Sequence, residues 1–377
     1  CDLHLQIDVK DSKKIVEELK SNNFKVDGAF TSIDLAVPTI SAIHKAYGFK
    51  YLPPKFDVVL SKEQMRRDWE NAGIFNRMSR NSEDITIDEI LEYNRKHSVL
   101  IKPDVAASSR GITVLGLNSN EEQIKTAISL AKSTSYNNIC LVEEYVRGRE
   151  FTVDMLGDDY GNVVVYGISV KYHSQYTSNN NRVAVKLHWN SNTYSDDIYK
   201  KIAEIGKLCY KACGIKNAYG HLEIIMKEDG SFSPIEIGAR TSGFIASHLA
   251  TASSGHDYLF DYIDVIHGGN VGSNDYINGE TSSMWYKYNI PTGYVCKKKC
   301  CLPDFLSDEI KVMYSNRDGL FEGRLYGMIE NDNSCDKEGF EMISGPRNVL
   351  TIENVMVSES RFLRSFCDYD KALPKED

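Results

Sequence analysis

The stretch of sequence that decides the fold covers residues 220–243 and reads GHLEIIMKEDGSFSPIEIGARTSG. Two apolar runs flank the polar turn at 227–230, which is the pattern of a β-hairpin. With a turn of this length, Glu223 should pair with Pro234, and Glu236 should lie two residues further along on the same face. Because proline cannot donate to a strand ladder, Pro234 also predicts an edge strand or a bulge.

The carboxylates of Glu223 and Glu236 form an acidic pair on a hairpin whose other face is apolar. At about 5 Å and an effective dielectric of about 20, two such charges repel by about 3 kcal/mol. The pair therefore needs a counter-ion, and hard carboxylate oxygens suit Mg²⁺. Arg240 follows in the same run, and a guanidinium beside a metal can clamp a carboxylate or a phosphate. Two alternatives stay open: the glutamates face solvent, or Arg240 only pairs with one of them.

Two lysines occupy positions that disfavour a positive charge. Lys102 lies near the end of the apolar strand expected at 99–103, where a buried ammonium is costly unless an anion meets it. Lys62 lies in the first turn of a helix that Ser61 should cap, with Gln64 at the third position, and the helix dipole disfavours cations there. A bound phosphate would satisfy both positions. The alternative for each is an ordinary solvated lysine.

Three further features suit a nucleotide. The small-residue loop at 106–111 could lay backbone N–H groups on phosphate oxygens, as a backbone nest does. The strand expected at 139–146 offers backbone groups to an adenine ring, and Glu150 could accept hydrogen bonds from ribose hydroxyls. The alternative is a pair of strands with exposed acids.

The order and spacing of these features resemble the ATP-grasp superfamily over residues 60–270. The ending Glu-Ile-Gly-Ala-Arg-x-x-Gly at 236–243 is similar to carboxylate–amine ligases of the L-amino-acid-ligase and carbamoyl-phosphate-synthase-like group. The resemblance implies an ATP-grasp fold of α/β and α+β character, preceded by the back part of a biotin-carboxylase-like N-terminal domain. The domains it implies are residues 1–55, an ATP-grasp domain at 56–285 with a lid subdomain at 97–147, and a mixed α/β region at 286–377.

The resemblance also implies roles for single residues of the nucleotide site. The nucleotide would be bound by Lys62, Lys102, Ser108, Ser109, Gly111, Glu143, Glu144, Tyr145, Val146, Glu150 and Lys171. In this set the lysines and the loop would hold phosphates, Glu143 would meet the adenine amino group, and Glu150 would meet the ribose. Replacing Lys102 by alanine is expected to weaken ATP binding and, by removing a poorly placed charge, to stabilise the free protein.

The resemblance assigns the catalytic centre to the hairpin. Glu223 and Glu236 would bind Mg²⁺, or Mn²⁺ in its place, and Arg240 would hold the substrate carboxylate and the transferred phosphoryl group. Gly238 departs from the pattern, because many members have asparagine at that position, and this puts two-metal coordination in question. His188 is a candidate base near the amine site, with a packed structural histidine as the alternative.

The implied reaction joins a small-molecule carboxylate to an amine. Such ligases form an acyl phosphate that the amine attacks, giving an amide or dipeptide with ADP and phosphate. Two alternatives are a phosphotransferase that stops at phosphoryl transfer and a non-catalytic nucleotide-binding regulatory protein. A cytoplasmic location is expected, and a homodimer is left open.

The composition excludes other functions. With 44 basic and 53 acidic residues among 377, the formal charge is −9, which disfavours nucleic-acid binding because phosphate contacts need clustered lysine and arginine. No apolar run approaches the roughly 18 residues of a membrane helix, so no membrane partner is expected. Nine scattered cysteines indicate reduced thiols, and a zinc site at Cys296, Cys300 and Cys301 lacks a fourth ligand. What precedes Cys1 is left open.

The remaining elements are read from periodicity and turn residues. The N-terminal residues predict a βαβα unit with strands at 4–9 and 27–31 and helices at 12–20 and 33–47. No G-x-G-x-x-G sequence is present, so dinucleotide binding has no support there. An amphipathic helix is expected at 196–212, and the Ser- and Asn-rich segment 174–182 suggests a mobile loop.

Overall fold

The computed structural model describes residues 4–52, 60–106, 109–176, 182–243, 246–288, 290, 292–296, 307–326 and 339–368. The chain folds into two compact units whose segments alternate along the sequence. Unit 1 comprises Cys1–Asn76, Phe151–Ile168 and Asp197–Ile277. Unit 2 comprises Arg77–Glu150, Ser169–Asp196 and Asn278–Asp377. The domain boundaries at residues 55 and 285 stay predictions.

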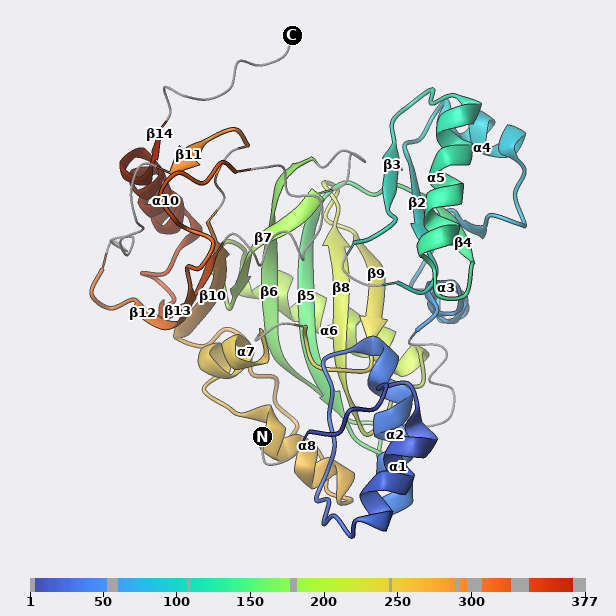
Figure 1. Ribbon diagram of the computed structural model, residues 1–377, viewed down its shortest axis with the longest axis vertical. Helices are drawn as coiled ribbons and strands as arrows, with labels where there is room; N and C mark the ends of the chain where they lie inside the picture. The colour runs from blue at the N-terminus through green and yellow to red at the C-terminus, as the bar shows by residue number, and fades with distance from the viewer. Residues whose placement is uncertain are drawn as a thin grey trace. The chain divides into compact units, whose positions relative to one another are not determined.

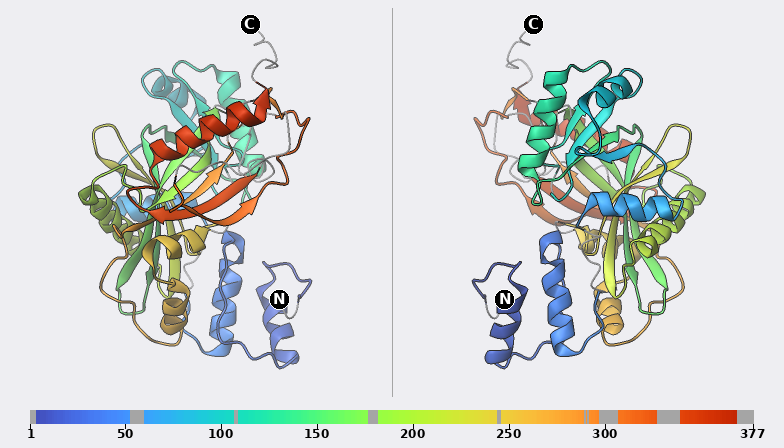
Figure 2. Two further views of the ribbon diagram at one scale, coloured as in Figure 1. Left: turned by 90° about the vertical axis from the view of Figure 1, so that its left-hand side faces the viewer. Right: turned by 90° about the vertical axis from the view of Figure 1, so that its right-hand side faces the viewer.

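Two helices, α1 (Ser12–Ser21) and α2 (Val37–Tyr47), lie side by side in the N-terminal part of unit 1 (Figures 1 and 2). Asp11 caps α1, because its side chain accepts from the Lys14 N–H at 3.1 Å. Gly48 ends α2 in the left-handed conformation, with a φ of 79°. Both predicted helices are therefore confirmed.

The strands predicted at 4–9 and 27–31 are absent from the described chain, so the βαβα interpretation was wrong. Backbone groups in these segments bond to side chains instead of to a neighbouring strand. The Val9 carbonyl accepts from a threonine hydroxyl of α2 at 2.6 Å, and the Ala29 N–H donates to Nε2 of His44 at 3.1 Å. Burial lowers the pKa of His44 to about 4, which keeps the ring neutral and able to accept.

The predicted hairpin lies at one end of an eight-stranded sheet. The four strands at that end, in the order β6-β5-β8-β9, are Val163–Tyr176, Arg149–Gly157, Ala218–Met226 and Phe232–Gly238 (Figure 1). The last two pair antiparallel across the turn, so the hairpin prediction is confirmed. Helix α6 (Asp196–Ala212) has the predicted bounds and packs Gly206 against Met155 and Val153 of β5.

Three other helices belong to unit 1: α3 (Lys62–Asn71), α7 (Ala246–Ser254) and α8 (Tyr258–Ile266). A short 3₁₀ helix, η1 (Asp34–Ala36), leads into α2. Helix α3 is tied to α6 by Trp69, whose indole N–H donates to the Cys209 carbonyl at 3.2 Å. This contact fixes the helix that carries Lys62.

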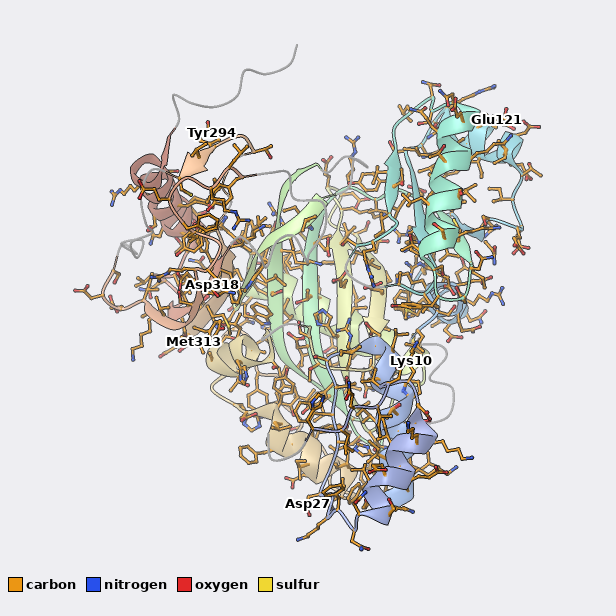
Figure 3. All side chains as sticks on the ribbon, viewed as in Figure 1. Lys10, Asp27, Glu121, Tyr294, Met313 and Asp318 are labelled. Carbon is orange, nitrogen blue, oxygen red and sulfur yellow. The ribbon has the colours of Figure 1, made fainter. Side chains whose placement is uncertain are left out.

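Unit 2 contains a small antiparallel sheet with two covering helices. Its strands, in the order β1-β4-β2-β3, are Ser79–Asn81, Cys140–Glu144, Val99–Pro103 and Thr113–Leu115. Helices α4 (Ile87–Asn94) and α5 (Glu121–Thr134) pack on it around a buried apolar cluster. Glu121 stands in the first turn of α5 (Figure 3), which begins after the capping residue Asn120.

The other four strands of the eight-stranded sheet belong to unit 2, together with a long helix that packs on them. In the order β12-β13-β10-β7, they are Lys311–Asn316, Phe340–Pro346, Thr281–Lys287 and Arg182–Trp189. Helix α10 (Ile352–Phe366) supplies Ile352 and Val355 to the core formed with Met284 and Ile343. The two-residue strands β11 (Val295–Cys296) and β14 (Cys367–Asp368) pair with each other. Of the loop predicted at 174–182, residues 177–181 lie outside the described chain.

No described helix combines the length and the apolar character needed to cross a membrane. Four cysteines are buried and free, namely Cys140, Cys209, Cys213 and Cys296. Burial raises the pKa of the Cys140 thiol to about 11 and that of Cys209 to about 12, so these thiols stay neutral. Cys300 and Cys301 of the alternative zinc site lie outside the described residues.

Candidate active site

Glu223 and Glu236 lie directly opposite each other on β8 and β9. The predicted pairing of Glu223 with Pro234 was wrong, because Pro234 pairs with Ile224 and the register shifts by one residue at this point. The extra residue is Ile235, so the edge strand carries the bulge that proline predicted. The pairs next to the turn, such as Met226 with Phe232, already lie one position from the predicted register, and the bulge adds one more. Glu236 is therefore directly opposite Glu223.

The ammonium of Lys62 lies against this acidic pair, with Nζ 2.9 Å from Oε2 of Glu236. Helix α3 begins at Lys62 because the Ser61 hydroxyl accepts from the Gln64 N–H at 3.2 Å, as predicted. The Lys62 side chain is only 11% exposed, which excludes the alternative of a solvated lysine. The anion that the helix terminus requires is therefore a carboxylate of the acidic pair in this structure.

Arg240 is held next to the pair by Asp34. Its Nε donates to Oδ1 of Asp34 at 2.7 Å, and Nη1 donates to the Thr241 carbonyl at 3.0 Å. Burial by itself disfavours the charged guanidinium, but Asp34, and to a smaller degree Glu236 and Glu223, outweigh burial and raise the pKa of Arg240. One guanidinium and one ammonium thus stand among three carboxylates, all within unit 1.

In unit 2, Lys102 and Glu143 form a buried ion pair. They lie on adjacent strands, with Nζ of Lys102 2.8 Å from Oε2 of Glu143. Glu143 also accepts from Nη2 of Arg77 at 3.1 Å and from the Ser79 hydroxyl at 3.0 Å. The Lys102 and Glu143 side chains are 2% and 0% exposed, so the expectation that Lys102 is poorly placed was wrong.

Replacing Lys102 by methionine is therefore expected to destabilise the protein. The substitution removes one of the two cations that meet the buried carboxylate of Glu143. Because Arg77 remains, the expected cost is about 2 kcal/mol, less than for a buried charge that loses its only partner. Urea unfolding monitored by circular dichroism measures the change, and Lys125→Met on exposed α5 is the matched control. A Lys102→Met protein as stable as wild type would contradict this assignment and restore the earlier expectation.

Glu150 is bound by two basic side chains of unit 2. Lys171 contacts one of its oxygens, and Nε2 of His173 lies 3.0 Å from the other. Burial favours the neutral acid, but the charges of Lys171 and His173 lower the pKa of Glu150 far below its usual range. The structure thus brings the predicted ribose ligand together with the predicted phosphate ligand Lys171.

Three further residues of the predicted nucleotide site directly follow Glu143 in the chain. Glu144 accepts from the Tyr93 hydroxyl at 2.8 Å, and the Tyr145 N–H donates to the Ser98 carbonyl at 2.9 Å. Val146 is buried. Their roles toward adenine stay predictions.

Two residues of the predicted 106–111 loop have left-handed backbone conformations, with φ of 55° at Ser109 and 73° at Gly111. A side chain at Gly111 would also meet the Thr134 side chain, so glycine is required there twice over. Ser108 lies outside the described residues. The phosphate contacts of this loop stay predictions.

His188 is completely buried, and its Nε2 lies 2.7 Å from the Ser282 hydroxyl. Burial lowers the pKa of His188 to about 3, so the ring does not accept a proton near neutral pH. The environment favours the packed structural histidine, and we leave His188 out of the machinery proposed below.

Two features of the site were missed by the sequence analysis. Asp34 precedes α2 and carries no motif, so nothing in the sequence marks its contact with Arg240. His221 forms a buried pair with Asp154, Nδ1 to Oδ1 at 2.9 Å. Strand alternation signals His221, because it lies two residues before Glu223 and therefore on the same face.

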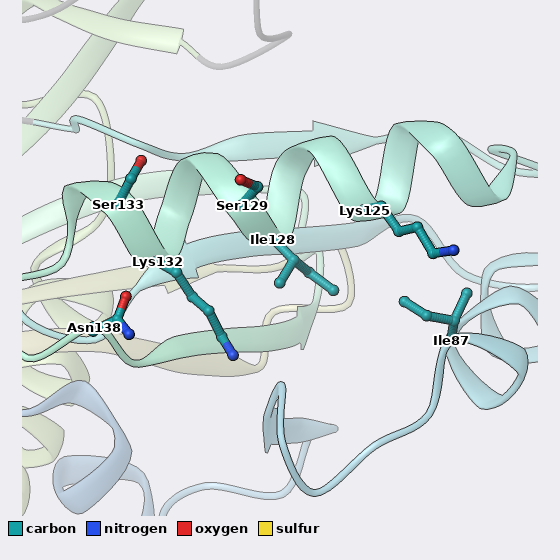
Figure 4. A pocket seen from close by; sticks show the side chains of 7 residues that line it. All are labelled: Ile87, Lys125, Ile128, Ser129, Lys132, Ser133 and Asn138. Carbon is teal, nitrogen blue, oxygen red and sulfur yellow. The ribbon is translucent and has the colours of Figure 1, made fainter.

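A shallow hollow of about 440 Å³ lies beside α5 in unit 2 (Figure 4). Its two lysines pair with surface glutamates, Lys125 with Glu121 at 2.5 Å and Lys132 with Glu83 at 3.2 Å. None of the predicted site residues lines this hollow, and we assign no function to it. Among the described residues, no group of three or more His, Cys, Asp or Glu side chains is placed to hold a metal ion.

Residues 95–248 match the family model of the ATP-grasp domain. The chain therefore contains an ATP-grasp domain. A D-alanine–D-alanine ligase of Actinobacillus succinogenes is 27% identical over 159 residues, which are 41% of this chain and 48% of that protein. The chain therefore spans about half the length of this curated relative. The activity, substrates and partners of the chain are treated below as proposals.

Solved structures confirm the predicted ATP-grasp fold. The crystal structure of an L-amino acid ligase from Bacillus licheniformis has a TM-score of 0.71 at 17% identity, covering 97% of this chain and 86% of that one. A biotin carboxylase–β-γ-ATP complex from Campylobacter jejuni has a TM-score of 0.66 at 14% identity, covering 95% and 78%. Because these likenesses extend over nearly the whole chain, they include the N-terminal residues for which a biotin-carboxylase-like domain was predicted.

Proposed function

We propose that the protein is an ATP-dependent ligase that joins a carboxylate to an amine through an acyl phosphate. The observation that carries the proposal is the set of charges within unit 1. Two directly opposed carboxylates, Glu223 and Glu236, are met by Lys62, and Arg240 stands beside them. Such a set can bind a metal–phosphate group and a carboxylate next to each other. The match of residues 95–248 to the ATP-grasp domain and the similarity to a D-alanine–D-alanine ligase support the same function.

The residues that would contact the nucleotide are given for each unit by itself. In unit 1, Lys62 would exchange its carboxylate partner for a phosphate oxygen. In unit 2, Lys102, Lys171 and the loop with Ser109 and Gly111 would contact phosphates. The strand segment from Glu143 to Val146 would meet adenine, and Glu150 would meet the ribose.

The donor set of the hairpin suits Mg²⁺, or Mn²⁺ in its place. Glu223 and Glu236 supply only carboxylate oxygens, and they are directly paired on adjacent strands. Hard cations prefer such ligands and complete their coordination with phosphate and water oxygens. When bound, the metal supplies neutralisation of the charge on the transferred phosphoryl group.

The chain's own residues then have separate tasks in the proposed reaction. Lys62 steadies the phosphates, and Arg240 orients the carboxylate oxygen that attacks the terminal phosphorus atom of ATP, releasing ADP. The amine nitrogen next attacks the carbonyl carbon of the acyl phosphate, the bond to the phosphate oxygen breaks, and the nitrogen loses a proton. The products are an amide, ADP and phosphate, and the catalysis is mostly positioning and charge neutralisation.

Product analysis tests the proposal. The purified chain is incubated with ATP, Mg²⁺ and pairs drawn from D- and L-amino acids and other carboxylates and amines, and phosphate release is recorded. Hits are examined by mass spectrometry for an amide. A phosphorylated carboxylate that accumulates whether or not an amine is present would identify the phosphotransferase alternative. ATP hydrolysis that stays at background with every pair would favour the regulatory alternative.

A further inference from the structure

Asp34 contacts the candidate site although no motif marks it. It opens η1, and its Oδ1 accepts from Nε of Arg240 at 2.7 Å, across 206 positions of sequence. The Asp34 side chain is 27% exposed and that of Arg240 is 14% exposed, so bulk water reaches the pair only in part. The adjoining backbone is tied down as well, because Thr241 donates both its N–H and its hydroxyl to the Thr31 carbonyl at 3.4 Å.

Gly238 leaves the space that this pair occupies. It lies in β9 two residues beyond Glu236, on the same face, and opposite His221. A Cβ atom at this position would stand 2.7 Å from Oδ1 of Asp34 and 3.2 and 3.3 Å from Cγ and Cζ of Arg240. A side chain at 238 would therefore have to displace Asp34, Arg240 or both.

The contact with Asp34 also decides how the guanidinium is turned. Asp34 takes the Nε–H and the Thr241 carbonyl takes one Nη1–H, so the Nη edge keeps the other donors of the group. An arginine side chain has many rotamers in solution, and a fixed carboxylate on its Nε edge removes most of that freedom. Asp34 thus orients Arg240 before any substrate binds.

We propose that Asp34 is a positioning residue, which holds Arg240 toward the carboxylate and phosphoryl groups in the space that Gly238 leaves open. The inference rests on the proposed function of Arg240. It also gives a reason for the glycine at 238, because an asparagine there would need the volume that Asp34 and Arg240 fill. At this place β9 has no side chain, and the carboxylate of Asp34 from the N-terminal segment fills the space.

A double-mutant cycle tests the contact without any substrate. Gly238→Ala is expected to lower the melting temperature by about 3–5 °C in the wild-type background, because the new methyl group meets Asp34. In the Asp34→Ala background the same change should lower it by only about 1 °C, since the carboxylate is gone and Arg240, no longer held by it, can move away from the methyl group. Gly272→Ala, which places its Cβ in open space, is the control. Equal shifts in both backgrounds would overturn the inference.

Kinetics test the positioning role once a substrate pair is known. Asp34→Ala should raise the KM of the carboxylate substrate and lower kcat, together costing about 30-fold in kcat/KM, with the KM of ATP within about twofold. Asp34→Glu should recover part of the loss and Asp34→Asn little, because orientation needs the charged acceptor. A purely structural role predicts equal effects on both substrates, and that result would overturn the inference.

The two proposals fail in distinguishable ways. If no carboxylate–amine pair is turned over, the ligase proposal fails, and the positioning role that rests on it falls with it, even if the melting temperatures show the Asp34–Gly238 coupling. If ligation is found but Asp34→Ala leaves the carboxylate KM and kcat unchanged, only the positioning role falls.

Discussion

Replacing Glu236 by glutamine is expected to lower Mg²⁺-dependent turnover by about 10²–10³-fold, because the amide keeps the size of the side chain but not its charge. Glu236 lies directly opposite Glu223, so the proposed metal would lose one of the two carboxylates that face it. The fold should survive, since the substitution also relieves the repulsion between the two acids. Phosphate release as a function of Mg²⁺ concentration measures the effect, and circular dichroism checks the fold.

A matched control lies in the same hairpin. Glu228 is exposed in the turn between β8 and β9, so Glu228→Gln removes an equal charge without touching the pair. It should leave the Mg²⁺ dependence unchanged, whereas Glu223→Gln should resemble Glu236→Gln. Wild-type turnover in the Glu236→Gln protein would contradict the metal assignment.

Features that depend on local sequence were predictable here. The caps at Asp11 and Ser61 formed because each side chain reaches a backbone N–H within one turn of its own helix. The hairpin followed from two apolar runs and a turn, and α6 from its single apolar face. Even the bulge had a local cause, because Pro234 lacks the N–H that a regular ladder requires.

The register of the hairpin was not predictable to the residue. The pairs nearest the turn already lie one position from the predicted register, and the bulge shifts every pair beyond it by one position more. The sequence located the bulge near Pro234 without saying on which side of Glu223 the shift would fall. Only the folded strand decides whether Glu236 is a direct or a diagonal neighbour of that residue.

The prediction of strands in the N-terminal segment was wrong for a related reason. A strand needs a neighbour for its backbone groups, and alternation within six residues does not reveal whether one exists. Here the side chains of α2 take those bonds, through His44 in particular. The apolar side chains of the first segment also gain little burial, because Leu5 and Ile7 are half-buried and Val9 is exposed.

The partners of the charged residues were the least predictable part of the site. Sequence analysis identified Lys62 and Lys102 as lysines that require an anion, and both have one. The anions are Glu236 and Glu143, which were themselves expected to bind a metal and an adenine. Long-range ion pairs join residues that share no local pattern, which is also why Asp34 went unnoticed.

The pairing of Lys62 with Glu236 leads to a second prediction with a large effect. Replacing Lys62 should change the affinities for Mg·ATP and for Mn²⁺ alone in opposite directions. Lys62→Met is expected to weaken binding of Mg·ATP by about 10–100-fold, because a charged hydrogen bond to phosphate is lost. The same change should strengthen binding of Mn²⁺ alone, since Glu236 would no longer be neutralised by an ammonium 2.9 Å away. Electron paramagnetic resonance titration with Mn²⁺, in the presence and absence of ATP, measures both quantities on one sample.

Arg67→Met is the control, because Arg67 lies on the same helix, is 59% exposed and pairs with Glu63. It should change neither affinity by more than about twofold, as expected for an exposed pair. The opposite signs are what separate the proposed exchange of partners from simple damage to α3, which would weaken both ligands together. If Lys62→Met weakens Mn²⁺ binding as well as nucleotide binding, the ammonium does not compete with the metal for Glu236, and the proposed exchange is wrong.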